Sequence, residues 1–346
     1  MSGHCFSPYM LICSGMQTIF GFERRNDMER QAEINQEFQS ELKAAKDQFQ
    51  EEQKAQEYAN LRAKMLVQRK YRAEERFDQT VLQHRTDELR TYFMDNLPIK
   101  KEVVSILLDV AKKYKEKNYN SECPLNIVLL HTKQNALNYD GIVDELEKNQ
   151  NQLGNIVYRR WCNKDAARNA AIFNLHAIMS NIPTLVISPY FQGGAIHYTA
   201  SLWEAQAEAK PMIRPLFSMP CPMEYLDPTC GFTKEGREKI QNQMVLISTI
   251  ISGCARDSYM LMSQGLRPTL PLYLKNNPII LETLLLPENK EICSFMLNEY
   301  YSMQKLLEKP ECPSHLLTKS EMGILADFAK EANNEIKSLT SKALNA

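Results

Sequence analysis

The stretch PLNIVLLH, residues 124–131, decides the fold of the middle of the chain. It is a continuous apolar run that follows a proline, which is typical of a strand buried on both faces of a sheet. Short apolar or β-branched runs recur downstream, at residues 156–162, 184–188 and 212–217. Helix-like segments separate them, at residues 141–148, 166–180 and 201–209. This alternation predicts an α/β domain with a parallel sheet over residues 98–219.

Upstream of this domain lies a long polar segment without helix breakers. No glycine or proline occurs between Gly21 and Pro98, and Glu, Gln, Lys, Arg and Ala dominate, all of them good helix formers. The composition predicts one long, coiled-coil-like helix over residues 28–97, roughly 100 Å in length at 1.5 Å per residue. Its sparse apolar positions, which include Ala59 and Leu66, extend beyond any small core and therefore need a partner helix.

The charges of this helix bear on how it pairs. Eight acidic and four basic residues lie within 29–57, and six basic and two acidic residues within 62–76. An antiparallel or staggered partner would bring opposite charges together, whereas a parallel partner in register would place like charges side by side. Ala55, Ala59 and Ala63 repeat every four residues and form a narrow face that another helix can approach. The pattern is compatible with a solvated single helix, with pairing inside the chain, and with self-association or a partner helix along residues 28–96.

The two ends of the chain differ in character. Residues 1–27 lack the basic start and the cleavage pattern of a secretory signal, so we expect a disordered or docking tail. Residues 220–346 open with an irregular linker that contains several prolines and then become helical. We expect helices there at residues 234–264, 288–307 and 320–341, with Ser320 as the cap of the last one.

Composition argues against several classes of protein. A net charge of −1 gives no general attraction to nucleic acid or to an anionic membrane. No apolar run reaches the 18 residues that a membrane span requires. The nine cysteines show neither a CxxC motif nor regular spacing, which is typical of free thiols in a reducing compartment. We therefore expect a cytoplasmic protein without a bound metal.

The candidate ligand site lies where the strands of the predicted sheet end, because ligands of open α/β sheets bind beside the carboxyl ends of the strands. The third predicted strand ends at Ser188 and is followed by Tyr190, and then by Gly193 and Gly194, which predict a turn or hairpin. We take these four residues as the candidate cofactor-binding residues. Neither a GxGxxG nor a Walker motif is present, so the identity of a cofactor stays open.

Other strand ends carry His131, Cys162 and Ser218. The first two are compatible with a thiol nucleophile and its base. No third residue that would orient the base is evident, and a strand-end cysteine is more often a small buried side chain.

One local order resembles the TIR-type domain, a flavodoxin-like α/β fold. A strand at 156–162, a helix at 166–180 and a strand that ends in Ser188 lead to the sequence Ser201-Leu202-Trp203-Glu204-Ala205. In that family such a strand leads to a helix start with Ser, Trp and a glutamate, and members that cleave NAD use the glutamate against the ribose. The resemblance implies Glu204 as the catalytic residue and a nucleotide as ligand. The insertion at 192–199, which contains His197, departs from the usual spacing of the family.

Two functions follow from these patterns. The first is an oligomerising adaptor or assembly protein, whose helix joins subunits and whose α/β domain binds a ligand or partner. The second is a nucleotide-processing enzyme of the TIR-like NAD glycohydrolase type that oligomerisation activates. The absence of a complete catalytic motif favours the first.

Overall fold

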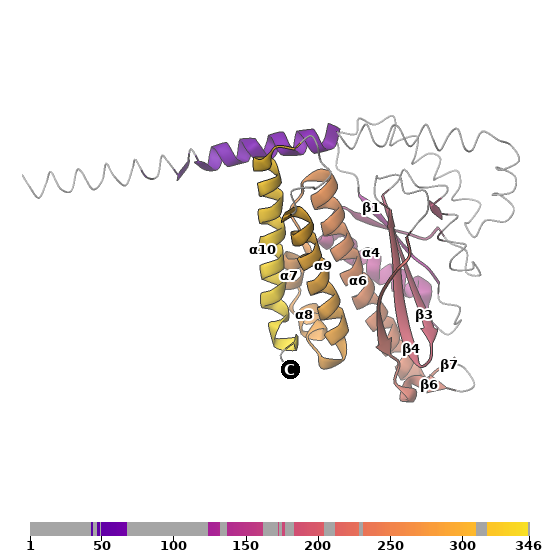
Figure 1. Ribbon diagram of the computed structural model, residues 1–346. Helices are drawn as coiled ribbons and strands as arrows, with labels where there is room; N and C mark the ends of the chain where they lie inside the picture. Colours follow the sequence, from indigo (N-terminus) through magenta and orange to yellow (C-terminus); the bar gives the residue numbers. More distant parts are fainter. Residues whose placement is uncertain are drawn as a thin grey trace, which may run out of the picture. The chain divides into compact units, whose positions relative to one another are not determined.

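The computed structural model describes the α/β part, the helical C-terminal part and a piece of the N-terminal helix (Figure 1). The residues that it describes are 43, 47–48, 50–67, 124–131, 137–161, 172, 175–176, 183–203, 212–227, 231–308 and 317–344. The predicted tail, residues 1–27, lies outside them, and so does most of the predicted long helix, residues 28–97. All described positions within residues 28–97 are helical.

The chain divides into two units, residues 1–59 and residues 60–346. In the larger unit, helical residues 60–67 pack against the C-terminal part. Leu61 is 0% exposed and Met65 is 5% exposed. The sulfur of Met65 lies so close to Gly265 that a Cβ at that glycine would come within 2.9 Å of it. These two apolar side chains therefore anchor helical residues 60–67 to the C-terminal part.

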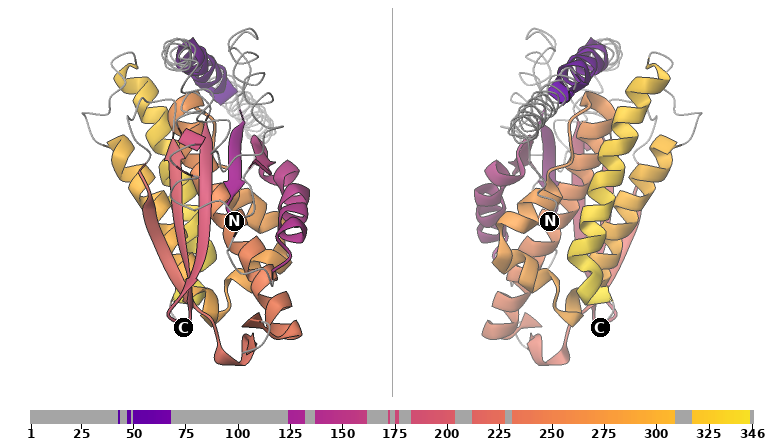
Figure 2. Two further views of the ribbon diagram at one scale, coloured as in Figure 1. Left: turned by 90° about the vertical axis from the view of Figure 1, so that its right-hand side faces the viewer. Right: turned by 90° about the vertical axis from the view of Figure 1, so that its left-hand side faces the viewer.

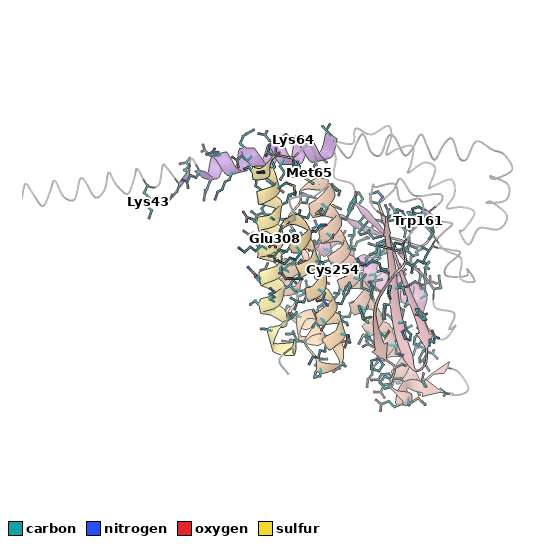
Figure 3. The ribbon with its side chains drawn as sticks, in the orientation of Figure 1. Lys43, Lys64, Met65, Trp161, Cys254 and Glu308 are labelled. Atoms are coloured by element: carbon teal, nitrogen blue, oxygen red, sulfur yellow. The ribbon has the colours of Figure 1, made fainter. Side chains whose placement is uncertain are left out.

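An ion pair of 2.7 Å between Lys64 and Glu321 joins the same helix to the C-terminal part. Lys64 and Met65 both lie on this helix (Figure 3). Burial alone would raise the pKa of Glu321, but the hydrogen bonds from Lys64 and Thr318 outweigh it and hold this pKa below its ordinary value. Leu61 and Met65 face this contact, while Leu66 is half-buried and Ala59 is exposed. The predicted pairing of Ala59 and Leu66 with a partner helix stays a prediction.

The α/β part holds a five-stranded sheet in the order β2-β1-β3-β4-β5. Its strands are β1 Leu125–Leu129, β2 Ile156–Arg159, β3 Thr184–Gln192, β4 Ala195–Trp203 and β5 Arg214–Pro220. β1 pairs in parallel with β2 and β3, whereas β4 runs antiparallel to both β3 and β5. The sheet is thus mixed, and the prediction of an entirely parallel sheet is wrong at β4.

The first half of the sheet is a parallel β-α-β unit. Helix α4, Tyr139–Leu153, connects β1 to β2. It begins where the Asn138 side chain accepts a hydrogen bond from the Gly141 amide, at 3.1 Å, and it ends at Gly154, whose φ is +69°. Both strands lie within the ranges predicted from the sequence, and α4 extends the predicted helix by several residues at its ends. Cys162 lies outside the described residues.

The second half is an antiparallel hairpin followed by an outer strand. Gly193 and Gly194 have φ values of +60° and +75°, which a two-residue hairpin turn requires. The chain therefore turns back directly after β3, and the predicted hairpin at these glycines is confirmed. The helix predicted from Ser201 is wrong over Ser201–Trp203, which form the end of β4, because the turn makes this segment pair with β3. The outer strand β5 includes Pro215 and Pro220.

Helices occupy one face of this sheet (Figures 1 and 2). Among the described elements, α4 contacts β2 and α6, and α6 contacts β1 and β3; α9 contacts β5, and α10 packs against α9. The contact between Phe217 of β5 and Phe295 of α9 has a ring separation of 5.3 Å. The main apolar core lies in this sheet-helix layer.

The C-terminal part is helical, as the sequence predicts. Its helices are α6 Lys234–Gln264, α7 Leu270–Asn276, α8 Pro278–Leu284, α9 Lys290–Glu308 and α10 Lys319–Leu344, and a two-stranded sheet of β6 Leu226–Asp227 and β7 Gly231–Phe232 precedes them. The bounds of α6 are those predicted, from the Thr233 cap to Gly265, whose φ is +65°. Thr318, not Ser320, caps α10: its hydroxyl accepts from the Glu321 amide while the Glu321 carboxylate accepts from the Thr318 amide.

Candidate functional site

The face of the sheet opposite these helices carries polar residues at its centre. Residues directly opposite each other on neighbouring strands point to the same face. Ser188 and Tyr190 of β3 pair with Thr199 and His197 of β4, so these four side chains share one face. Phe191, the next residue of β3, points to the helical side, and its ring centroid lies 5.2 Å from that of Phe232.

Polar groups are fully buried on this face. Ser188 and Ser201 are 0% exposed, and neither hydroxyl has a hydrogen-bond partner in the part of the chain that the structure describes. An unsatisfied buried hydroxyl costs about 1–3 kcal/mol. Asn126 of β1 is buried as well, but its amide donates to the Pro183 carbonyl at 3.1 Å and its oxygen accepts from Arg159 at 2.9 Å. The centre of the face is thus polar, and among the described residues only some of its polar groups have hydrogen-bond partners.

Towards the hairpin tip the same face becomes accessible and contains a histidine with two defined partners. His197 Nδ1 lies 2.6 Å from Ser218 Oγ, and Nε2 lies 3.0 Å from the Gln192 carbonyl oxygen. The Tyr190 ring stacks on the imidazole, with ring centroids 4.9 Å apart. Ser218 is exposed and lies directly across from His197 on β5.

The predicted ligand-binding residues lie along one line of β3 and its turn. Ser188 is buried, Tyr190 is half-buried, and Gly193 and Gly194 form the exposed turn. A Cβ at either glycine would meet no atom within 4 Å, although its positive φ would strain other residues. The tip is therefore open on the glycine side.

The predicted catalytic residue Glu204 lies outside the described residues. The residue before it, Trp203, pairs with Thr184, where β3 begins. Thr184 and Tyr190 are six positions apart on β3, a span of roughly 20 Å at about 3.3 Å per residue. Strand β4 thus carries the chain away from the hairpin tip before it reaches position 204, because it runs antiparallel to β3.

The other strand-end residues are also accounted for. His131 stacks on Tyr139 of α4, with ring centroids 3.4 Å apart. Its suggested partner Cys162 lies outside the described residues, so that pair stays a prediction. Sequence reasoning noted His197 and Ser218 separately and missed their contact. The two glycines between two strand-like runs could have indicated part of it. A two-residue turn at Gly193-Gly194 fixes which residues of the two strands lie opposite each other, and this places His197 on the same face as Tyr190.

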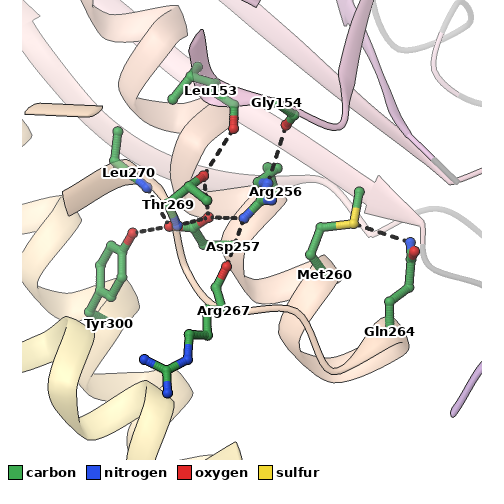
Figure 4. A network of polar contacts seen from close by, with 10 residues as sticks. All are labelled: Leu153, Gly154, Arg256, Asp257, Met260, Gln264, Arg267, Thr269, Leu270 and Tyr300. Carbon is green, nitrogen blue, oxygen red and sulfur yellow. Dashed lines mark hydrogen bonds and ion pairs between the residues drawn. The ribbon is translucent and has the colours of Figure 1, made fainter. Parts of the chain in front are cut away.

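A second polar cluster is buried among the helices (Figure 4). Asp257 of α6 accepts hydrogen bonds from Arg256 at 2.7 Å, from the amides of Thr269 and Leu270 at 2.9 Å each, and from the Tyr300 hydroxyl. Arg256 also donates to the Gly154 and Arg267 carbonyls. Burial and the Asp257 carboxylate raise the pKa of Tyr300 well above its ordinary value. Because its members satisfy each other, this cluster joins α4, α6, α7 and α9 and is structural.

Among the described residues, no group of His, Cys, Asp and Glu is arranged to hold a metal ion. In the same part of the chain, every helix is too short or too polar to cross a membrane. Comparisons with protein-family models, with curated proteins and with solved structures found no match to this chain.

Proposed function

We propose that the protein is an assembly protein that associates with a second copy of itself through residues 28–96 and uses its α/β part to bind a ligand or partner. The observation that carries this proposal is the exposure of the alanine face of the helix. Ala63 is exposed, while Leu61 and Met65, two positions to either side, are buried. Residues two apart point to opposite sides of a helix. One side of the helix is thus used inside the chain, and the side of Ala63 stays accessible.

The remaining alanines support the same conclusion. Ala55 and Ala59 are exposed as well, at the four-residue spacing that continues the face of Ala63. The acidic block 29–57 and the basic block 62–76 complement each other when a second copy lies antiparallel. Exposed ion pairs contribute only about 0.2–1 kcal/mol each, so close packing on the alanine face must supply much of the affinity. We place this assembly in the cytoplasm, because Cys221, Cys254 and Cys293 are free thiols.

Sedimentation velocity of the full chain tests the proposal. We expect wild type to form a dimer or larger oligomer, and the double variant Ala59→Arg, Ala63→Arg to dissociate because the bulky side chains block close approach. The control is Gln53→Arg, compared with each single variant Ala59→Arg and Ala63→Arg: it adds the same single charge to an exposed position away from the alanine face. A monomeric wild type, or a double variant that associates as well as wild type, would contradict the proposal.

A second candidate function is hydrolysis of a nucleotide such as NAD, with Glu204 stabilising a cationic ribosyl centre as carboxylates do in glycoside hydrolysis. The parallel strands β2-β1-β3 support it, since flavodoxin-like domains begin with the same order, while β4 departs from that fold by running antiparallel to β3. Nicotinamide release from NAD by wild type at high protein concentration, and its loss in Glu204→Gln with an unchanged melting temperature, are the expected results. A folded, oligomeric wild type that releases no nicotinamide would contradict this candidate.

A further inference from the structure

The contact between Ser218 and His197 has a defined direction of proton donation. A carbonyl oxygen can only accept a hydrogen bond, so the imidazole nitrogen that contacts it must carry the hydrogen. That nitrogen is Nε2, which lies 3.0 Å from the Gln192 oxygen. In the neutral ring Nδ1 is then without a hydrogen, and it accepts the Ser218 hydroxyl proton across 2.6 Å.

This is the arrangement that a serine nucleophile requires. A hydroxyl becomes nucleophilic when an adjacent base takes its proton, and the base must itself be oriented by a third group. Here Ser218 provides the hydroxyl and His197 the base. The Gln192 carbonyl orients the ring from the far side, and Tyr190 packs on its face at 4.9 Å. Relative to the Ser-His-Asp triad, the roles of the two ring nitrogens are exchanged and a neutral carbonyl takes the place of the carboxylate, so it orients the ring without adding a negative charge.

We propose that Ser218 and His197 form a nucleophilic site that cleaves small carboxylic esters, an activity separate from assembly. The Ser218 oxygen attacks the ester carbonyl and its proton passes to His197 Nδ1. The tetrahedral intermediate collapses, the carbon-oxygen bond to the alcohol breaks, and the alcohol leaves with the proton from Nδ1. Water then attacks the Ser218 ester with His197 again as base, which releases the carboxylic acid and restores the hydroxyl. No redox partner or metal takes part in these steps.

The surroundings of the dyad leave it accessible to an ester and provide an apolar surface beside it. Ser218 is exposed on β5, the outer strand of the sheet, so an acyl group reaches the hydroxyl without entering the core. Tyr190 is half-buried beside the imidazole and offers an aromatic surface to an apolar acyl chain. The glycine turn leaves open space on the same hairpin. These features fit a small ester with a short apolar acyl group.

A covalent probe tests the site directly in the full chain. A fluorophosphonate transfers its phosphonyl group to an activated serine: a phosphorus-oxygen bond forms, fluoride leaves, and the serine proton goes to the base. After labelling, peptide mass spectrometry locates the modified serine. We expect modification at Ser218, with hydrolysis of p-nitrophenyl acetate lost in Ser218→Ala. His197→Gln keeps a hydrogen-bonding side chain without a base and should slow both reactions by about 10²–10⁴-fold, the usual contribution of a general base.

Ser302 provides the matched control. It is exposed on α9, and no contact between it and a described histidine is present. Ser302→Ala should leave the labelling and the esterase rate unchanged, and Ser302 itself should label at a rate at least 100-fold below Ser218. The proposal is overturned if wild type labels Ser218 no faster than Ser302, or if His197→Gln labels Ser218 at the wild-type rate. Thermal melts of each variant confirm that the comparison is made between folded proteins.

Discussion

Removal of the Asp257 carboxylate should destabilise the protein more than removal of any exposed charge. Asp257 and Arg256 have side chains only 0% and 4% exposed. Asp257→Ala would leave the Arg256 charge buried with carbonyl partners alone, a loss of about 3–5 kcal/mol for a broken buried pair. It would also leave the Thr269 and Leu270 amides, at the start of α7, without their acceptor. Native proteins are stable by only about 5–15 kcal/mol, so this is a large fraction of the total.

Urea unfolding followed by circular dichroism measures this loss. With a slope of roughly 3 kcal/mol per M urea, the midpoint should fall by roughly 1–1.7 M. Tyr300→Phe removes one hydrogen bond to the same carboxylate and should cost about 1.5–3 kcal/mol. Asp327→Ala, at an exposed position of α10, is the control and should change stability by no more than about 0.5 kcal/mol. If Asp257→Ala unfolds within 1 kcal/mol of wild type, the assignment of the cluster as a structural centre is mistaken.

Two further predictions concern the sheet. Val186→Asp places an unpaired charge at a 0% exposed position of β3 and should lower the melting temperature or prevent folding, whereas Gln53→Asp, on an exposed helical position, should be nearly silent. Burial raises the pKa of Tyr158 and Tyr198 far above 10.0, their ordinary value. Near pH 10 these two tyrosines therefore lose their protons only in the unfolded chain. Their contribution to the free energy of unfolding is complete below that pH, and above it this free energy should fall by about 1.4 kcal/mol per pH unit for each tyrosine.

Thermal melts of Val186→Asp and Gln53→Asp check the prediction for the buried strand. A Val186→Asp variant that folds with the wild-type melting temperature would mean that β3 is not buried. Urea titrations at pH 9, 10 and 11 check the second. Tyr198→Phe should remove the contribution of that tyrosine, about 1.4 kcal/mol per pH unit, from the fall in unfolding free energy above pH 10. An equal slope in wild type and Tyr198→Phe would show that this hydroxyl does not lose its proton on unfolding.

The sequence could predict the elements whose causes are local. Helix α6 has its predicted bounds because Thr233 caps one end and Gly265 adopts a left-handed conformation at the other. The apolar runs likewise mark β1, β2 and β3. The direction of β4 could not be read from its own residues, because Ser201 and Trp203 suit a helix start as well as a strand. Pairing across the turn decided between them.

The candidate site was predictable only in part for the same reason. Tyr190 and the two glycines are close in sequence and stay close in space. The contact between His197 and Ser218 joins residues 21 positions apart, and it depends on the register of β4 with β5. The docking of Leu61 and Met65 depends on a surface at least 200 residues away in the sequence, which helical periodicity alone does not reveal.

The two outer strands of the sheet limit how copies of this protein can add to one another. Strand β5 contains Pro215 and Pro220, which have no amide hydrogen to offer a further strand, and its Arg214 is held by an ion pair with Glu299 at 2.8 Å. Strand β2, at the opposite side, is four residues long. Short strands and prolines at the borders of a sheet discourage the growth of sheets from one molecule into the next. At high local concentration, these borders keep copies of the chain from joining sheet to sheet into a fibre.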